Sequence, residues 1–122
     1  MRNARLSRLF GLTPLVGICL FVVLYAIAAI IYPGGSNTDR NQKGFSLFSN
    51  YWCDLLNDVA KNGDYNTSRP FALAAMILLC TSLAFFWYFL PLFIYTEREN
   101  QKIIQFSGVS SMVTAIFVFT KY

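Results

Sequence analysis

The chain contains no histidine among its 122 residues. This absence removes Ser-His-Asp and Cys-His nucleophile pairs, helical zinc-protease motifs and His-ligated haem, unless a second chain supplies the imidazole. Cysteine is also scarce: there are three, and Cys19 and Cys80 lie inside apolar runs, where a free cysteine behaves as a small hydrophobic residue. The sequence therefore predicts no disulfide framework.

Charged residues are also few. Asp, Glu, Lys and Arg make up only 13% of the chain, against about a quarter in a soluble domain, and apolar residues make up 56%. Three runs, residues 12–32, 71–95 and 103–120, carry no charged residue at all. Each is close to the roughly 20 residues that a helix needs to cross a bilayer. We therefore predict an all-α integral membrane protein with three transmembrane helices, forming a single membrane domain over residues 1–122.

The first run has a basic start and an Ala26-Ile27-Ala28 triplet, as a cleaved secretory signal does. Its uncharged length exceeds the 7 to 15 residues expected of a signal core. We therefore interpret residues 12–32 as an uncleaved first span.

Residues 33–70 hold half of the chain's charged residues and separate the first two runs. From Phe48 to Val59 the apolar residues recur at steps of three and four, which is the pattern of an amphipathic helix. We expect a short amphipathic helix over about residues 46–61, with Tyr51 and Trp52 at the depth of the lipid headgroups and the Asn and Asp residues on the opposite face.

Basic residues predict the orientation. Three arginines lie in the first 11 residues, and Arg98 and Lys102 lie in the short linker before the third run. Because Lys and Arg concentrate on the cytoplasmic side, we predict a cytoplasmic N-terminus and an extracytoplasmic loop over residues 33–70, in the cell membrane. The expected partners are membrane lipids and other transmembrane helices of the same or another chain, and no nucleic acid.

A candidate polar site lies in the loop and at its end. Asp54 and Asp58 are one helical turn apart with Asn50 a turn earlier, and carboxylates beside an amide can bind a hard cation or act as acid and base. Arg69, at the head of the second run, suits either a lipid phosphate or an interfacial anchor. The alternative for the acidic pair is a solvated face, which amphipathic helices present by default. We assign no catalytic residue, no metal site and no cofactor.

The third run is the most polar of the three. Ser107, Ser111 and Ala115 form a row of small residues at spacing four, which allows another helix to approach closely. A catalytic serine is not indicated, because no base is present to activate it. Asn66-Thr67-Ser68, in the loop, forms a glycosylation sequon, a triplet that also arises by chance.

The stretch GFSLFSNYWCDLLNDVAKNGDYNTSRPFALAAM, after a basic N-terminus and one span, resembles the uncharacterised bacterial membrane family catalogued as domain of unknown function 998. Phe45-Ser46 occupies the place of the family's aromatic-Ser element and Asp54-Leu55-Leu56 that of its short amphipathic helix, with Leu56-Asn57 where the family has a Leu-Gly step. Members are typically about twice as long with roughly six spans, so the resemblance implies that this chain corresponds to an N-terminal half. It implies no catalytic residue, since the family has no agreed activity.

Two classes of function remain. The first is a non-enzymatic membrane protein that packs against lipids or other subunits, as a helix-packing or accessory subunit. The second is the N-terminal half of a lipid-active enzyme or transporter with a site at the outer interface. The orientation of Asn50 and Asp54 relative to Arg69 discriminates between them.

Overall fold

The structure is a computed structural model that describes residues 2–94 and 97–121. Three long helices dominate it, and two short 3-10 segments, η1 and η2, lie between them. Within the described residues there is no strand, only two isolated bridges, Gly34 with Lys43 and Val59 with Tyr65. The elements are α1 (Arg2–Ile31), η1 (Trp52–Leu56), α2 (Arg69–Phe89), η2 (Leu90–Leu92) and α3 (Arg98–Thr120).

All three helices are long and apolar enough to span a membrane, which confirms the prediction of three such helices. The spanning segments are Gly11–Ile31, Arg69–Phe89 and Arg98–Thr120. Their apolar side chains are mostly exposed: only 17%, 22% and 6% of the respective windows is buried. Exposed apolar surface of this extent suits hydrocarbon better than water, so the length and composition of the three helices are those of a multi-pass membrane protein.

Some helix ends differ from the predicted ends of the spans, although the first candidate span, Gly11–Ile31, agrees with the predicted residues 12–32. The first helix begins at Arg2 and includes the basic flank, and the third begins at Arg98, about a turn before the predicted start at residue 103. The second ends at Phe89, because Pro91 cannot continue an α-helix and lies in the 3-10 turn Leu90–Leu92. Its predicted end at residue 95 lies outside the described residues.

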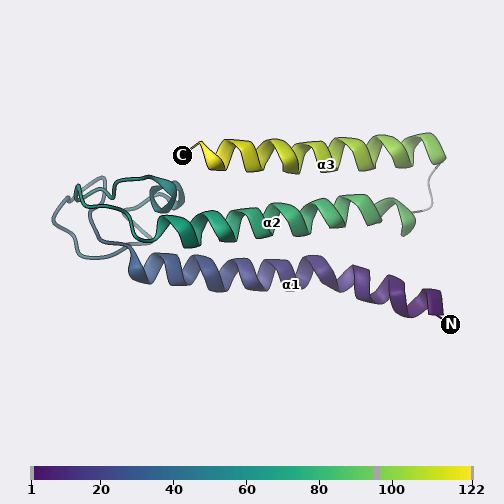
Figure 1. Cartoon of the computed structure of the whole chain (residues 1–122), viewed down its shortest axis with the longest axis horizontal. Helices are drawn as coiled ribbons and strands as arrows, with labels where there is room; N and C mark the ends of the chain where they lie inside the picture. Colours follow the sequence, from purple (N-terminus) through teal and green to yellow (C-terminus); the bar gives the residue numbers. More distant parts are fainter. Residues whose placement is uncertain (1, 95–96, 122) are drawn as a thin grey trace.

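The helices lie side by side with α2 in the middle, and neighbouring helices run antiparallel (Figure 1). Close contacts join α2 to both of the others. A Cβ at Gly17 of α1 would overlap the side chain of Ser82 on α2. A Cβ at Gly108 of α3 would overlap Trp87 of α2 in the same way. These two glycines let the helix backbones approach closely, as small residues do in membrane proteins.

Residues 32–68 fold into a compact unit, here called the cap, at the end of the helix layer where α1 ends and α2 begins (Figure 1). The main core of the chain lies where the cap meets these two helices. Alanines on both helices allow the close packing there, and two leucines of η1 fill the centre. The buried members are Tyr25, Ala28, Tyr32, Leu55, Leu56, Ala60, Ala72 and Ala75.

The amphipathic helix predicted over residues 46–61 is not seen. Its place is taken by turns, the 3-10 segment Trp52–Leu56 and the Val59–Tyr65 bridge. Leu55 and Leu56 are buried, whereas Phe48, which the pattern placed on the same apolar face, is 100% exposed. The physical reason is that Asn and Asp side chains in this segment bind backbone amides, which gives the backbone an alternative to helical hydrogen bonds.

Candidate functional site

Tight turns at Gly34 and Gly35 start the cap directly after α1. Both residues have positive φ angles, 139° and 80°, which glycine adopts without strain. A Cβ on Gly35 would overlap the backbone of Lys61 and Asn62, so these glycines allow two distant parts of the cap to meet. Gly35 N donates to Gln42 O at 2.7 Å, and Asn62 N donates to Gly34 O at 3.2 Å.

Asn50 and Asp54 point into the cap and not toward solvent, which corrects their expected placement on an exposed polar face. Asp54 is 2% exposed. Its Oδ2 accepts from the Tyr51 amide at 2.9 Å and from Asn50 Nδ2 at 3.4 Å, and its Oδ1 lies 3.4 Å from Lys61 Nζ. Asn50 also donates to Gly35 O at 2.8 Å. Both carboxylate oxygens of Asp54 are therefore engaged in holding the cap together.

Asp58 and Arg69 form a second, separate ion pair. The Asp58 side chain is 67% exposed, and Arg69 Nε donates to Leu56 O at 3.0 Å. The four residues of the predicted site thus divide into an Asn50–Asp54 pair with Lys61 and an Asp58–Arg69 pair. Among the described contacts, none joins Asp54 to Arg69, so the arrangement does not assemble an acid–base centre around the arginine.

Asn66 is the central polar residue of the cap, and the sequence analysis assigned it no such role. It is 0% exposed. Its Nδ2 reaches the carbonyl oxygens of Asp54 and Leu55 at 3.2 Å and of Asn57 at 2.8 Å, while its Oδ1 accepts from the Ser68 amide at 3.1 Å. The only sequence signal was an Asn two residues before a Ser that precedes a helix. A side chain held in this way is inaccessible to a glycosyltransferase, so the sequon is not a modification site of the folded cap.

Two tyrosines and a threonine attach the cap to the helix ends. Tyr25 of α1 donates its hydroxyl to Trp52 O at 2.6 Å, and its ring stacks on the Trp52 ring with centroids 5.1 Å apart. Tyr32 accepts from the Lys61 amide at 3.0 Å. Thr67 Oγ1 donates to Ile31 O at 3.0 Å, which joins the end of α1 to the start of α2. Burial raises the pKa of the Tyr32 hydroxyl, and the hydrogen bond from Lys61 opposes this only in part.

The predicted small-residue row of α3 is only partly covered. Ser107 and Ser111 are exposed and Ala115 is half-buried. The Ser111 hydroxyl donates to Ser107 O at 2.7 Å within the helix, so it is satisfied without a partner helix. It is Gly108, one position along from Ser107, that packs against α2.

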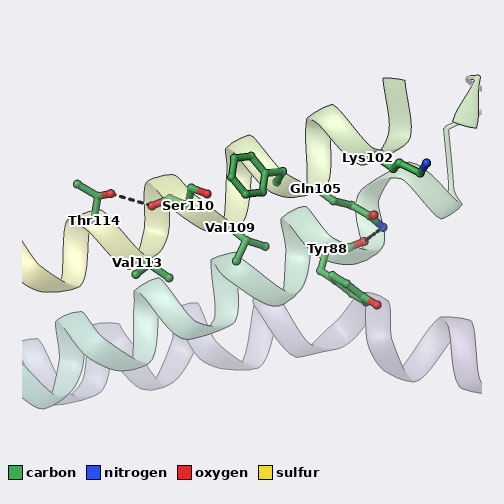
Figure 2. Close-up of a pocket in the computed structure, with 8 residues that line it drawn as sticks. Tyr88, Lys102, Gln105, Val109, Ser110, Val113 and Thr114 are labelled. Atoms are coloured by element: carbon green, nitrogen blue, oxygen red, sulfur yellow. Dashed lines mark hydrogen bonds between the residues drawn. The ribbon is translucent and has the colours of Figure 1, made fainter. Parts of the chain in front are cut away.

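A hollow of about 550 Å³ lies along α3 beside Tyr88 of α2. Figure 2 shows Val109, Val113 and Ser110 along α3, with the Gln105 amide donating to Tyr88 O at 2.8 Å and Thr114 donating to Ser110 O at 2.9 Å. Its remaining lining residues are Lys102 and Phe106. Apolar side chains with back-bonded hydroxyls suit the surface of a neighbouring helix.

Within residues 2–94 and 97–121, no group of three or more His, Cys, Asp or Glu side chains is arranged to hold a metal ion. The free thiols of Cys19 and Cys53 are exposed, and Cys80 is buried. Comparison with known proteins finds no family model, no curated protein and no solved structure that matches this chain.

Proposed function

We propose that this chain is a non-enzymatic helix-packing or accessory subunit whose three helices cross the cell membrane and whose third helix binds a further transmembrane helix. The observation that carries the proposal is the one-sided packing of α3. Only 6% of its apolar window is buried, and it contacts α2 along the side that contains Gly108. Ser107 and Ser111 remain exposed beside this contact, and they are the type of small-residue pair found where membrane helices meet.

The cap supports a non-enzymatic role. Its buried polar groups are used in internal hydrogen bonds, and no buried side-chain N or O atom of the described residues lacks a partner. Buried networks that are fully satisfied make a structure rigid and unique. The cap therefore acts as a rigid connection that fixes α1 and α2 relative to each other.

The resemblance to domain of unknown function 998 extends the proposal. In that family's arrangement, further spans of the same polypeptide would supply the helix that covers α3. A helix of another subunit is the alternative source, and the experiment below separates the two.

A photoreactive amino acid placed at Ser111 tests the proposal in native membranes. We expect irradiation to join it to a transmembrane segment of this or another polypeptide, which mass spectrometry of the adduct identifies. The matched control is the same amino acid at Ile30, an exposed position of α1, which should yield lipid adducts. Lipid adducts alone at both positions would rule out a partner helix on α3.

The proposed orientation places the cap outside the cytoplasm and the α2–α3 connection inside. In a background in which Ser replaces the native cysteines, Asn41→Cys in the cap should react with an impermeant maleimide on intact cells. Glu99→Cys at the start of α3 should react only after permeabilisation. Both side chains replaced here are exposed, so the variants leave the packing intact. The reverse pattern would invert the topology.

A further inference from the structure

An apolar groove of about 200 Å³ lies between α1 and the overhanging edge of the cap. One side is a face of α1 along its last turns, and the other is the part of the cap around η1. The lining residues are Phe21, Val22, Tyr25, Ala26, Ala29, Phe45, Leu47 and Trp52.

The groove lies below the end of α1, at a depth that the contacts of Tyr25 define. Tyr25 is six residues before Ile31, which corresponds to about 9 Å along the helix axis at 1.5 Å per residue. The ring of Trp52 stacks on the ring of Tyr25, and the carbonyl oxygen of Trp52 accepts a hydrogen bond from the Tyr25 hydroxyl. The edge of the cap therefore reaches back about 9 Å along α1, which is the depth where headgroups give way to acyl chains if α1 spans the bilayer as proposed.

The chemistry of the groove admits hydrocarbon. The hydroxyl of Tyr25 is already bonded to Trp52 O, and the other lining side chains, apart from the indole of Trp52, are purely apolar. The groove is also bordered by exposed apolar surface of α1, since its lining residue Val22 is 56% exposed. That surface meets the lipid chains if α1 spans the bilayer, so the groove opens directly onto them.

Exposed basic residues lie in the segment of the cap that leads to Phe45 of the groove. The bridge between Gly34 and Lys43 places Lys43 beyond the end of α1, two residues before Phe45, whose ring packs against Tyr32 in an edge-to-face contact. Lys43 and Arg40 are exposed, and neither forms an ion pair among the described residues. An ammonium group at this level complements a lipid phosphate.

We propose that the groove is a phospholipid site, which holds one acyl chain between α1 and Trp52 while Lys43 binds the phosphate of the same lipid. The inference rests on the proposed insertion of the helices in a bilayer and adds to it a specific ligand. Because Trp52 and Tyr25 join the cap to α1 at the same place, the bound lipid would stabilise the cap.

The fluorescence of Trp52 in vesicles measures the occupancy directly. The chain has two tryptophans, so Trp87→Phe leaves Trp52 as the only emitter. Phospholipids brominated on the acyl chain quench a nearby indole. Titrated into vesicles of unlabelled lipid, they should quench Trp52 in a saturable manner at low mole fraction. The complementary Trp52→Phe variant, which reports Trp87, should show quenching in proportion to the mole fraction.

Two substitutions on α1 separate the groove from the rest of the helix surface. Ala26→Phe fills the groove, and Val23→Phe adds the same bulk on an exposed part of α1 that does not line it. We expect Ala26→Phe to raise the mole fraction for half-maximal quenching about tenfold, the ratio that corresponds to a 1.4 kcal/mol loss of preference. Val23→Phe should leave it unchanged. Lys43→Gln, at an exposed position, should also raise the mole fraction for half-maximal quenching.

Failure of the site and failure of insertion give different results. Quenching of Trp52 in simple proportion to mole fraction, or unchanged by Ala26→Phe and Lys43→Gln, would overturn the site while leaving insertion intact. Quenching that falls as the protein-to-lipid ratio rises would show that a second copy fills the groove, and would also overturn it. Absence of quenching at both Trp52 and Trp87 would contradict insertion itself. Should Ala26→Phe not fold, the Lys43→Gln titration still decides.

Discussion

Gly17 of α1 lies directly against Ser82 of α2, so closely that a methyl group on Gly17 would overlap the Ser82 side chain. The Ser82 hydroxyl donates to Leu78 O at 2.7 Å, which keeps it inside its own helix and leaves room for the opposing backbone. The contact fixes α1 against α2 at a distance from the cap. Two separate regions therefore hold this helix pair, the cap at one end and the Gly17–Ser82 contact farther along.

Gly17→Ala should destabilise the helix pair by about 1–3 kcal/mol, the usual effect of overpacking, reduced by the roughly 0.5–1 kcal/mol that alanine gains over glycine in a helix. Gly11→Ala is the matched control, because nothing lies within 4 Å of the added methyl group. Gly11→Ala should therefore show only the stabilisation that comes from the higher helix propensity of alanine. Equilibrium unfolding in mild detergent, followed by helical circular dichroism, measures both. Equal stability of the two variants would contradict the close contact.

Asn66→Ala should loosen the cap. It removes the amide group that donates to three carbonyl oxygens, two in buried and one in a part-buried hydrogen bond, at a cost of about 1–3 kcal/mol for each buried group left unpaired. Hydrogen exchange of the amides in residues 50–66 should accelerate markedly while exchange in α2 and α3 stays slow. Asn41→Ala, at an exposed position where only the backbone amide is bonded, serves as the control. If the two variants exchanged alike, Asn66 would not be the centre of the cap.

The two acidic residues of the loop should differ in importance. Asp54→Ala removes a buried carboxylate with three partners and should cost about 2–4 kcal/mol in unfolding free energy. Asp58→Ala removes an exposed partner of Arg69 and should cost about 0–1 kcal/mol. Chemical denaturation of the two variants under identical conditions compares them. A larger loss for Asp58→Ala would reverse the structural assignment.

The stability of the cap should fall in strong alkali because the Tyr32 hydroxyl ionises. Its pKa in the folded state is raised above the ordinary value of 10.0, because burial disfavours the phenolate. In that window the unfolded chain binds fewer protons than the folded one, so stability falls as pH rises. The contribution of Tyr32 is complete below pH 10.0 and is lost as pH rises through its folded pKa. The free energy of unfolding, measured against pH, should decline less steeply above pH 10.0 for Tyr32→Phe than for the unsubstituted protein. An identical decline in both proteins would exclude Tyr32 as its source.

The helices could be predicted because their signal is simple. A long charge-free run has few possible structures other than a membrane helix, so the number of runs predicted the number of helices. The glycine contacts could not be predicted in the same way. Gly11, Gly17 and Gly108 look alike in the sequence, and only the structure shows that the last two lie against a neighbouring helix.

The fold of the cap could not be predicted from hydrophobic periodicity. The three- and four-residue spacing predicted an amphipathic helix that is not seen, and it placed Asn50 and Asp54 on a solvent face although both are buried. Asn50 instead donates to the backbone of Gly35 and Asp54 pairs with the side chain of Lys61, and Asn66 reaches backbone carbonyls over nine to twelve residues. Such bonds depend on how the loop closes on itself, and hydrophobic spacing carries no information about that.

The reactivity of Cys19 tests most directly whether lipid surrounds the helices. Its thiol is exposed in the structure and lies within the Gly11–Ile31 segment. With the other two cysteines replaced by Ser, an aqueous maleimide should leave Cys19 unmodified in intact vesicles and modify it only after the helices are released from lipid by a denaturing detergent. Asn41→Cys in the cap, in the same background without Cys19, should react in intact outward-facing vesicles. Rapid labelling of Cys19 in vesicles, at the rate of the cap cysteine, would place α1 in water and contradict a bilayer-spanning fold.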